Sequence, residues 1–156
     1  MKTSFVEELK IVSAIKPQAG AAITGDYISM RDCGRVGVLV HINQAAANTV
    51  AITIEQAKTA AGGSSTALVK TVPIYANEDC DASDTMVKKT DAVSFTTSAA
   101  IKTKTVLFQI DSIDLTDGYD FITVKTGASN AGNITSAEYI LSDLRYAQAT
   151  PPSVIV

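Results

Sequence analysis

Apolar and polar residues alternate along the middle of the chain. In residues 36–42, Val or Ile occupies every second position. A period of two is typical of a β-strand with one buried face, because successive side chains point to opposite faces of a sheet. The pattern returns in residues 50–55 after a short loop of small residues, Gln44–Asn48. The two runs therefore predict a hairpin or a crossing between two sheets.

The same pattern predicts further strands along the chain, at Ala67–Val72, Val93–Thr97, Val106–Ile110, Asp120–Thr126 and Ala137–Tyr146. Segments rich in Gly, Asn, Asp and Ser separate them, at Ala60–Ser65, Asn77–Asp84 and Asp111–Asp120. About eight short strands, roughly ten to fifteen residues apart, are typical of an antiparallel sandwich. We therefore predict an all-β domain, an antiparallel β-sandwich or jelly roll, over residues 20–147.

The first 19 residues follow a different pattern. Ser4 stands three residues before Glu7, which is the spacing of a helix-capping box. Phe5, Leu9 and Val12 then form an apolar stripe at helical spacing. The pattern predicts a short helix or arm that ends at Lys16-Pro17, because proline disfavours a helical conformation in the residue before it. This segment would either cover the core of its own domain or reach a neighbouring subunit, and the pattern leaves both uses open.

The composition favours a folded protein that contacts other proteins. Hydrophobic residues make up 46% of the chain and charged residues 19%, with a net charge of −3. Interface cores are depleted in charge, and nucleic-acid binding needs a basic surface, so protein partners are expected and nucleic acid is not. Glu7, Glu8 and Lys10 interrupt the apolar N-terminal pattern, which argues against a signal peptide or membrane span and for synthesis in the cytoplasm.

The sequence shows no recognisable catalytic arrangement. His41 is the only histidine, and it lies within a predicted strand without a Cys or His at ligand spacing. Cys33 and Cys80 have no basic neighbour that would activate them, and we expect two reduced, half-buried thiols. We therefore predict no catalytic residue, no cofactor, no metal ligand and no enzymatic activity.

One acidic turn leaves an alternative open. Asp111, Asp114, Asp117 and Asp120 recur at every third residue. Such carboxylates could face a calcium ion, although the spacing is not that of an EF-hand and Asp also caps turns without any ion. A calcium- or carbohydrate-binding β-sandwich is thus the alternative. Sugar sites commonly stack rings on aromatic side chains, but this chain has no Trp and 6% aromatic residues.

Several strand sequences resemble a known class of proteins. The segments Tyr27–Asp32, Arg35–Ile42, Val50–Ala57 and Glu138–Tyr146 are similar to small virion structural proteins of tailed bacteriophages and prophages. Within that class they look like the jelly-roll proteins that decorate, or cement, a capsid. The likeness covers roughly residues 20–150 and consists of strand patterns without a catalytic motif.

The resemblance implies a function and a location. Such a protein would bind the major capsid protein on the outside of an assembled shell as a homo-oligomer, a dimer or a trimer, and would stabilise the shell. A head–tail or tail component is the alternative within the virion. Contacts would come from the termini and the long loops, which can reach across subunits. The candidate contact residues are Phe5, Leu9, Val12, Pro151 and Pro152, and the extended tail over residues 148–156 would carry the last two.

Overall fold

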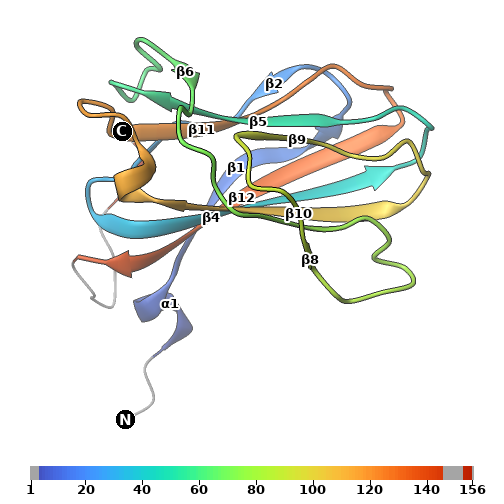
Figure 1. The fold of residues 1–156 in the computed structure, drawn as a ribbon, viewed down its shortest axis with the longest axis horizontal. Helices are drawn as coiled ribbons and strands as arrows, with labels where there is room; N and C mark the ends of the chain where they lie inside the picture. The colour runs from blue at the N-terminus through green and yellow to red at the C-terminus, as the bar shows by residue number, and fades with distance from the viewer. Residues whose placement is uncertain (1–3, 146–152, 156) are drawn as a thin grey trace.

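The protein is a sandwich of two antiparallel β-sheets (Figure 1). The structure is a computed structural model that describes residues 4–145 and 153–155. Sheet A has six strands in the order β1 (Lys10–Ala19), β12 (Asn133–Leu144), β4 (Cys33–Gln44), β10 (Thr103–Asp111), β7 (Ile74–Asn77) and β8 (Val87–Lys88). Sheet B has the path β2 (Ile23–Thr24), β11 (Phe121–Thr126), β5 (Ala51–Ala57) and β6 (Thr66–Ala67), with β3 (Ile28–Ser29) on β11 and β9 (Ser94–Thr96) on β5.

The connections make this sandwich a jelly roll. The order β1-β12-β4-β10 in sheet A faces the order β2-β11-β5-β9 in sheet B. The chain crosses from one sheet to the other between most successive strands of this set, which is the wrapping of a double Greek key. The sequence predicts the sandwich and about eight strands, but not that β1 and β2 are among them. The other four strands, β3, β6, β7 and β8, are only two to four residues long.

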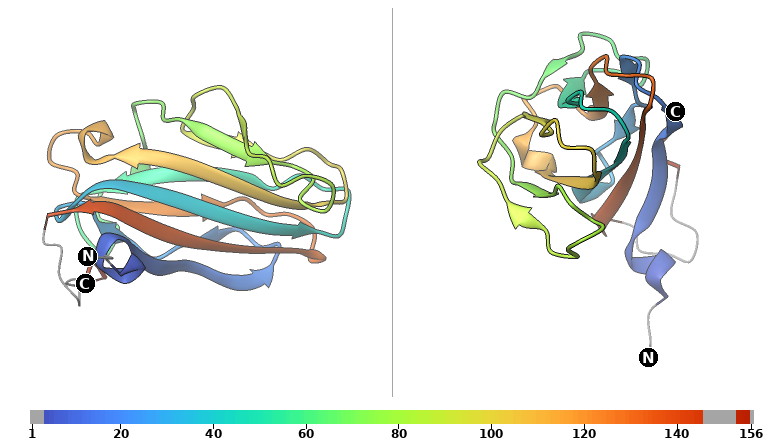
Figure 2. Two further views of the ribbon diagram at one scale, coloured as in Figure 1. Left: turned by 90° about the horizontal axis from the view of Figure 1, so that it is seen from below. Right: turned by 90° about the vertical axis from the view of Figure 1, so that its right-hand side faces the viewer.

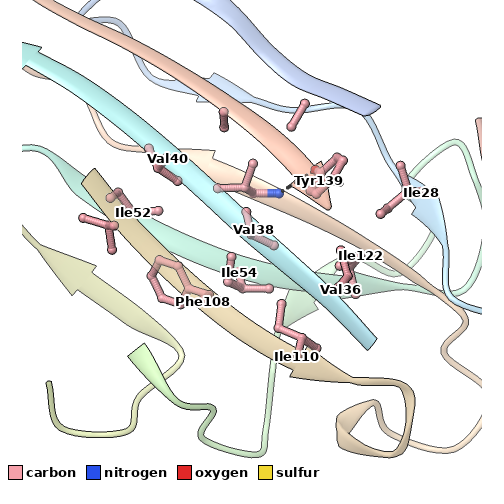
Figure 3. Packing of buried hydrophobic residues seen from close by; sticks show 14 of the residues in the cluster. Ile28, Val36, Val38, Val40, Ile52, Ile54, Phe108, Ile110, Ile122 and Tyr139 are labelled. Carbon is pink, nitrogen blue, oxygen red and sulfur yellow. Dashed lines mark hydrogen bonds between the residues drawn. The ribbon is translucent and has the colours of Figure 1, made fainter. Parts of the chain in front are cut away.

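Alternation along the strands creates the core between the sheets (Figure 3). Val36, Val38 and Val40 of β4 are fully buried, and Ile52 and Ile54 of β5 meet them from sheet B. Each β-branched side chain fits the pleated surface and contributes about 1.5–3 kcal/mol when it is fully buried. The period of two in the sequence therefore accounts for both the sheets and the core.

The predicted N-terminal helix is correct only in its first turn. Helix α1 covers Phe5–Glu8, and the Ser4 amide donates to the Glu7 carboxylate at 2.8 Å, as the capping pattern predicts. From Lys10 onward the chain is the strand β1 instead of a helix. Val12 and Ala14 are buried, while Ile11 and Ser13 face solvent. The apolar positions in residues 9–15 fit the period of a helix and that of a strand, and pairing with β12 selects the strand.

Strand β1 is an edge of sheet A and is irregular. Its pairing with β12 shifts register between Ser13 and Ile15 and again between Ile15 and Gln18. Pro17 lies in the second irregular stretch, and a proline within a sheet is tolerated at an edge because it has no N–H to donate. β1 therefore belongs to the sandwich that was predicted to begin at residue 20.

One predicted strand is shorter in the structure, and the tail is described only in part. Only Thr66–Ala67 of the Ala67–Val72 region is a strand, although Leu68 and Val72 are still buried. In the tail, Ser153 and Ile155 are exposed, while Val154 is buried and its carbonyl accepts from the Ser29 amide at 3.0 Å. The described part of the tail thus packs on the sandwich. Pro151 and Pro152 lie outside the described residues.

A tyrosine hydroxyl joins the two sheets. Tyr139 of β12 is fully buried, accepts from the Val124 amide of β11 at 3.1 Å and donates to the Asp26 carbonyl at 2.8 Å. Between β2 and β3 there is a gap, so no strand pairs with Val124 on this side of β11. The Tyr139 hydroxyl accepts the hydrogen bond of the Val124 amide in place of a strand carbonyl. Burial raises the pKa of Tyr139 to about 12. Gly25 closes this gap, and a Cβ there would approach the Ala14 carbonyl to 3.0 Å.

A lysine is buried at one end of β10. Lys104 lies on the core side of the strand and has no exposed surface. Its ammonium group donates to the Gln44 amide oxygen at 3.0 Å and to the Ser98 carbonyl and hydroxyl at 2.6 and 3.1 Å. Gln44 also donates to the Ser98 carbonyl and accepts from Thr97. Burial lowers the pKa of Lys104, and Glu78 partly offsets the effect. The network attaches the loop before β10 to β4.

We expect Tyr139→Phe to lower the free energy of unfolding by about 1–3 kcal/mol, because it leaves the Val124 N–H and the Asp26 carbonyl without a partner inside the protein. Chemical denaturation measures this change. Tyr75→Phe is the matched control, since the described residues offer its hydroxyl no hydrogen-bond partner and its loss should change little. Equal effects of the two substitutions would contradict the role given to Tyr139.

We expect Gln44→Leu to lower the free energy of unfolding by about 1.5–3 kcal/mol, since it removes an acceptor from a buried ammonium group. Lys104→Met should cost less, because Thr97 still donates to Gln44, and Gln44 still donates to Ser98. The double variant should be more stable than Gln44→Leu alone. Denaturation of all four proteins gives the coupling, and strictly additive effects would rule the network out.

Candidate interaction surface

The solvent-facing side of sheet A, here called the outer face, carries apolar residues where polar ones are expected. Leu39, Leu107 and Ile140 each lie between two core residues of their strand and are half-buried. In the sequence they are the middle residues of three apolar triplets, 38–40, 106–108 and 139–141. A strand with one solvated face would have a polar residue at each of these positions.

The register of the strands brings these residues together. Leu39 pairs with Leu107, which pairs in turn with Tyr75. In the adjacent row, Ile140 pairs with Ile11, whose side chain is 57% exposed. The result is an apolar patch that runs from the edge strand β1 across β12, β4 and β10 to β7, with Glu138 and Gln109 as polar members of the two rows. Patches of this kind mark protein–protein contacts when they are contiguous.

A hollow lies in this patch over Gly37. Gly37 stands between Ile140 and Gln109 in its row, and it has no side chain to fill the space. The hollow has a volume of about 210 Å³, and its walls are Leu9, Arg35, Gly37, Leu107, Gln109, Ile140 and Ser142. A Cβ at Gly37 would lie 3.2 Å from the Leu107 Cδ1 atom. The floor of the hollow is therefore set by a glycine.

Helix α1 projects from the same side of the molecule. In Figure 1 it lies below the sandwich, and in the view from below (Figure 2, left) it stands at one end of β1. Phe5 and Val6 are 64% and 60% exposed. The four-residue helix therefore presents two large apolar side chains to solvent beside the hollow that Leu9 lines.

The candidate contact residues from the sequence have different surroundings. Phe5 is exposed and Leu9 is half-buried against the outer face. Val12 is 9% exposed within the core of its own chain and is not available to a partner. Pro151 and Pro152 cannot be placed, because they lie outside the described residues. The outer-face residues were not predicted from the sequence, although the three apolar triplets carried the signal.

A second exposed apolar pair, here called the loop pair, consists of Val69 and Ile113. They are 79% and 78% exposed. An ion pair between Lys70 and Asp114 holds their two segments together. Ile113 lies in the short 3-10 helix η1 (Ser112–Asp114), directly after β10. Strands β12 and β4 separate β10 from β1, so the loop pair lies across the sheet from α1.

His41 and Cys80 lie beside the apolar patch of the outer face, and Cys33 lies inside the core. His41 is exposed on its strand, and its Nδ1 atom lies 3.2 Å from the Thr105 hydroxyl. The Cys80 sulfur lies 3.4 Å from the same hydroxyl. Cys33 is fully buried, and burial raises the pKa of its thiol to about 11. Both cysteines are free, and only Cys80 is half-buried as predicted.

The aspartates of the acidic turn point to different cations. Asp111 pairs with Arg35 at 2.7 Å, Asp114 with Lys70, and Asp120 with Arg31 at 2.7 Å. Asp114 also accepts from the Asp111 amide, which caps η1. Within residues 4–145 and 153–155, no group of three or more His, Cys, Asp or Glu residues is arranged to hold a metal ion. These carboxylates act as turn caps and ion-pair partners.

A polar pocket lies at the end of the sandwich near η1. Its volume is about 430 Å³, and its lining includes Arg31, Asp32, Tyr119, Asp120 and Arg145. The Arg31 guanidinium binds Asp120 and lies 5.7 Å from the centre of the Phe121 ring. Arg31 is thus already held by its own chain.

Among the described residues, no helix is long and apolar enough to cross a membrane.

Comparisons with known proteins give only distant likenesses. No protein family and no curated protein matches the sequence. Among solved structures, the SPBc2 prophage-derived protein YomS is similar over 86% of this chain and 94% of its own, with 9% identity and a TM-score of 0.49. A "putative sugar binding protein" from Bacteroides thetaiotaomicron is similar over 91% and 86%, with 13% identity and a TM-score of 0.32. Likenesses this weak do not establish a shared function.

We expect a thiol reagent near neutral pH to modify Cys80 in the native protein and to leave Cys33 unmodified. The thiolate is the reactive form, and Cys33 is both buried and hard to deprotonate. Mass spectrometry of the labelled protein identifies the modified residue. Denaturant should make both thiols reactive, and equal labelling of both without denaturant would contradict this assignment.

Proposed function

We propose that this protein is a non-enzymatic structural component of a tailed-phage or prophage virion. In this proposal it binds the major capsid protein on the outside of the shell and stabilises the assembled capsid. Single apolar residues such as Val87 and Ile101 are exposed elsewhere on the described chain. The observation that carries the proposal is that exposed apolar residues occur in pairs at two separate places, on α1 beside the outer face and in the loop pair. A subunit with two such surfaces can contact two different neighbours, as an assembly component must.

Three further points support this proposal. The jelly roll provides a rigid body whose loops and termini can reach other subunits. The strand sequences resemble those of capsid decoration proteins. The charge is low, and the outer face has apolar residues at its centre, like the core of a protein interface.

The loop pair is the part that we assign to the shell. Val69 and Ile113 project from connections and not from strands, so they can enter a groove between capsid subunits. A protein that binds only the assembled shell shifts the assembly equilibrium toward it by mass action. Many copies on one particle would add their effects, so modest affinity at each site is enough to stabilise the shell.

We expect the protein to be present on purified virions of the phage or prophage that encodes it. Mass spectrometry of the particles would detect the chain, and cryo-electron microscopy would show its jelly roll outside the shell. Particles of the parent phage that lack the chain would overturn the proposal. Density at the neck or tail would assign the protein to another part of the virion and would equally overturn decoration.

Variants locate the contact. Val69→Ser combined with Ile113→Ser should lower occupancy on particles, while the thermal unfolding of the purified protein stays close to that of the parent. Ile101→Ser is the control, because Ile101 is 59% exposed but lies in the loop before β10, at the opposite end of that strand from Ile113. Full occupancy with the double variant would rule out the loop pair as the shell contact.

A further inference from the structure

We infer that the outer face binds a second copy of the same chain, with Phe5 of each copy inserted into the hollow over Gly37 of the other. The hollow is an apolar recess of about 210 Å³ with Leu9, Leu107 and Ile140 in its walls. Phe5 is an apolar side chain, 64% exposed, on the helix beside it. The chain therefore carries both halves of a complementary contact.

The positions of the two halves favour a closed dimer. Leu9 follows α1 directly and also lines the hollow, so the projecting helix and the recess are neighbours on one side of the molecule. When two outer faces meet around a two-fold axis between helix and hollow, each helix lies over the hollow of the other copy. Both contacts then form at once, as in an isologous interface. No helix or hollow is left free to bind a third subunit, so the assembly stops at the dimer.

Helix α1 is acidic and carries Glu7 and Glu8. The wall of the hollow has one cation, Arg35, with the carboxylates of Asp111 and Asp143 near it. Arg35 makes one bond to Asp111 through its Nε atom, and its side chain is 46% exposed. Docking therefore brings an acidic helix toward a guanidinium group with remaining donors. The same arrangement disfavours an acidic surface of another kind at the base of the helix, where Glu7 and Glu8 would repel it.

The area of the outer face is somewhat smaller than that of a standard dimer interface. The four long strands β1, β12, β4 and β10 have 9 to 12 residues each. With about 3.3 Å per residue and about 4.8 Å between strands, they cover on the order of 600 Å² in projection. A standard interface buries roughly 800 Å² per partner. The face and the inserted helix together approach that size.

This inference rests on the proposed use of the outer face as a docking surface, but not on the shell contact. Its test uses the purified full-length protein without particles, so its failure and that of the shell contact are separate results. We expect the parent protein to sediment as a dimer in analytical ultracentrifugation. A monomer at every concentration up to the limit of solubility would overturn the inference.

Two variants remove one half of the contact each. Phe5→Ser removes the inserted side chain, and Gly37→Val fills the hollow. Each should weaken the dimer by roughly a hundredfold, since two contacts are lost and a buried Phe is worth about tenfold or more in each. Ile101→Ser, with a similar exposed fraction but far along the sheet, should leave the dimer intact. An unchanged dimer for Phe5→Ser or Gly37→Val would overturn the inference.

Mixing the two variants is the decisive experiment. In a mixed dimer, Phe5 of the Gly37→Val chain meets the open hollow of the Phe5→Ser chain, so one of the two contacts is restored. The mixture should therefore dimerise more tightly than either variant alone, and no gain on mixing would refute the exchange. Thermal unfolding checks that both variants fold. If Gly37→Val does not fold, Gly37→Ala serves, because only the mobile end of Leu107 lies close to its new Cβ.

Discussion

The register of β4 against its two neighbours is the constraint on which the rest of the structure depends. β4 pairs with β12 on one side and β10 on the other, without a break along β10. Because side chains alternate, this register fixes the core and the outer face together: a shift by one residue would expose Val38 and bury Leu39. Tyr139 then holds sheet A at a fixed position on sheet B through the Val124 amide. The core and the apolar patch are thus two results of one pairing.

The local pattern was sufficient to predict much of the fold. Residues 36–42 and 50–55 alternate with the period of a strand and are buried on the expected side. Their structure could therefore be predicted from the local sequence alone. Residues 9–15 fit a helix as well as a strand, and β12, more than a hundred residues away, decides between them. The burial of Lys104 was also hidden, because its acceptors Gln44 and Ser98 meet only after the sheets form. The local pattern of apolar and polar residues carries no information about contacts between residues far apart in the sequence.

The candidate interaction surface was also only partly predictable from the sequence. The sequence analysis named Phe5 and Leu9 from their apolar character, and both lie at the surface beside the outer face. It also named Val12, which the strand turns inward. The triplets around Leu39, Leu107 and Ile140 were visible as exceptions to alternation, but their meeting on adjacent strands depends on register. A search for apolar residues at the solvent-facing positions of successive strands would have found the patch.

The irregular edge of β1 limits how copies of this protein can associate. An open strand edge is a template for adding further strands, and a protein held at high density on a surface meets its own copies constantly. Pro17 and the two register shifts interrupt the hydrogen-bonding row of β1, so continuous pairing from edge to edge is hindered. Contacts are thereby directed from the edge to the faces of the sheet. The irregularity of β1 thus hinders fibre growth by strand addition, while the faces of the sheet can still make side-chain contacts.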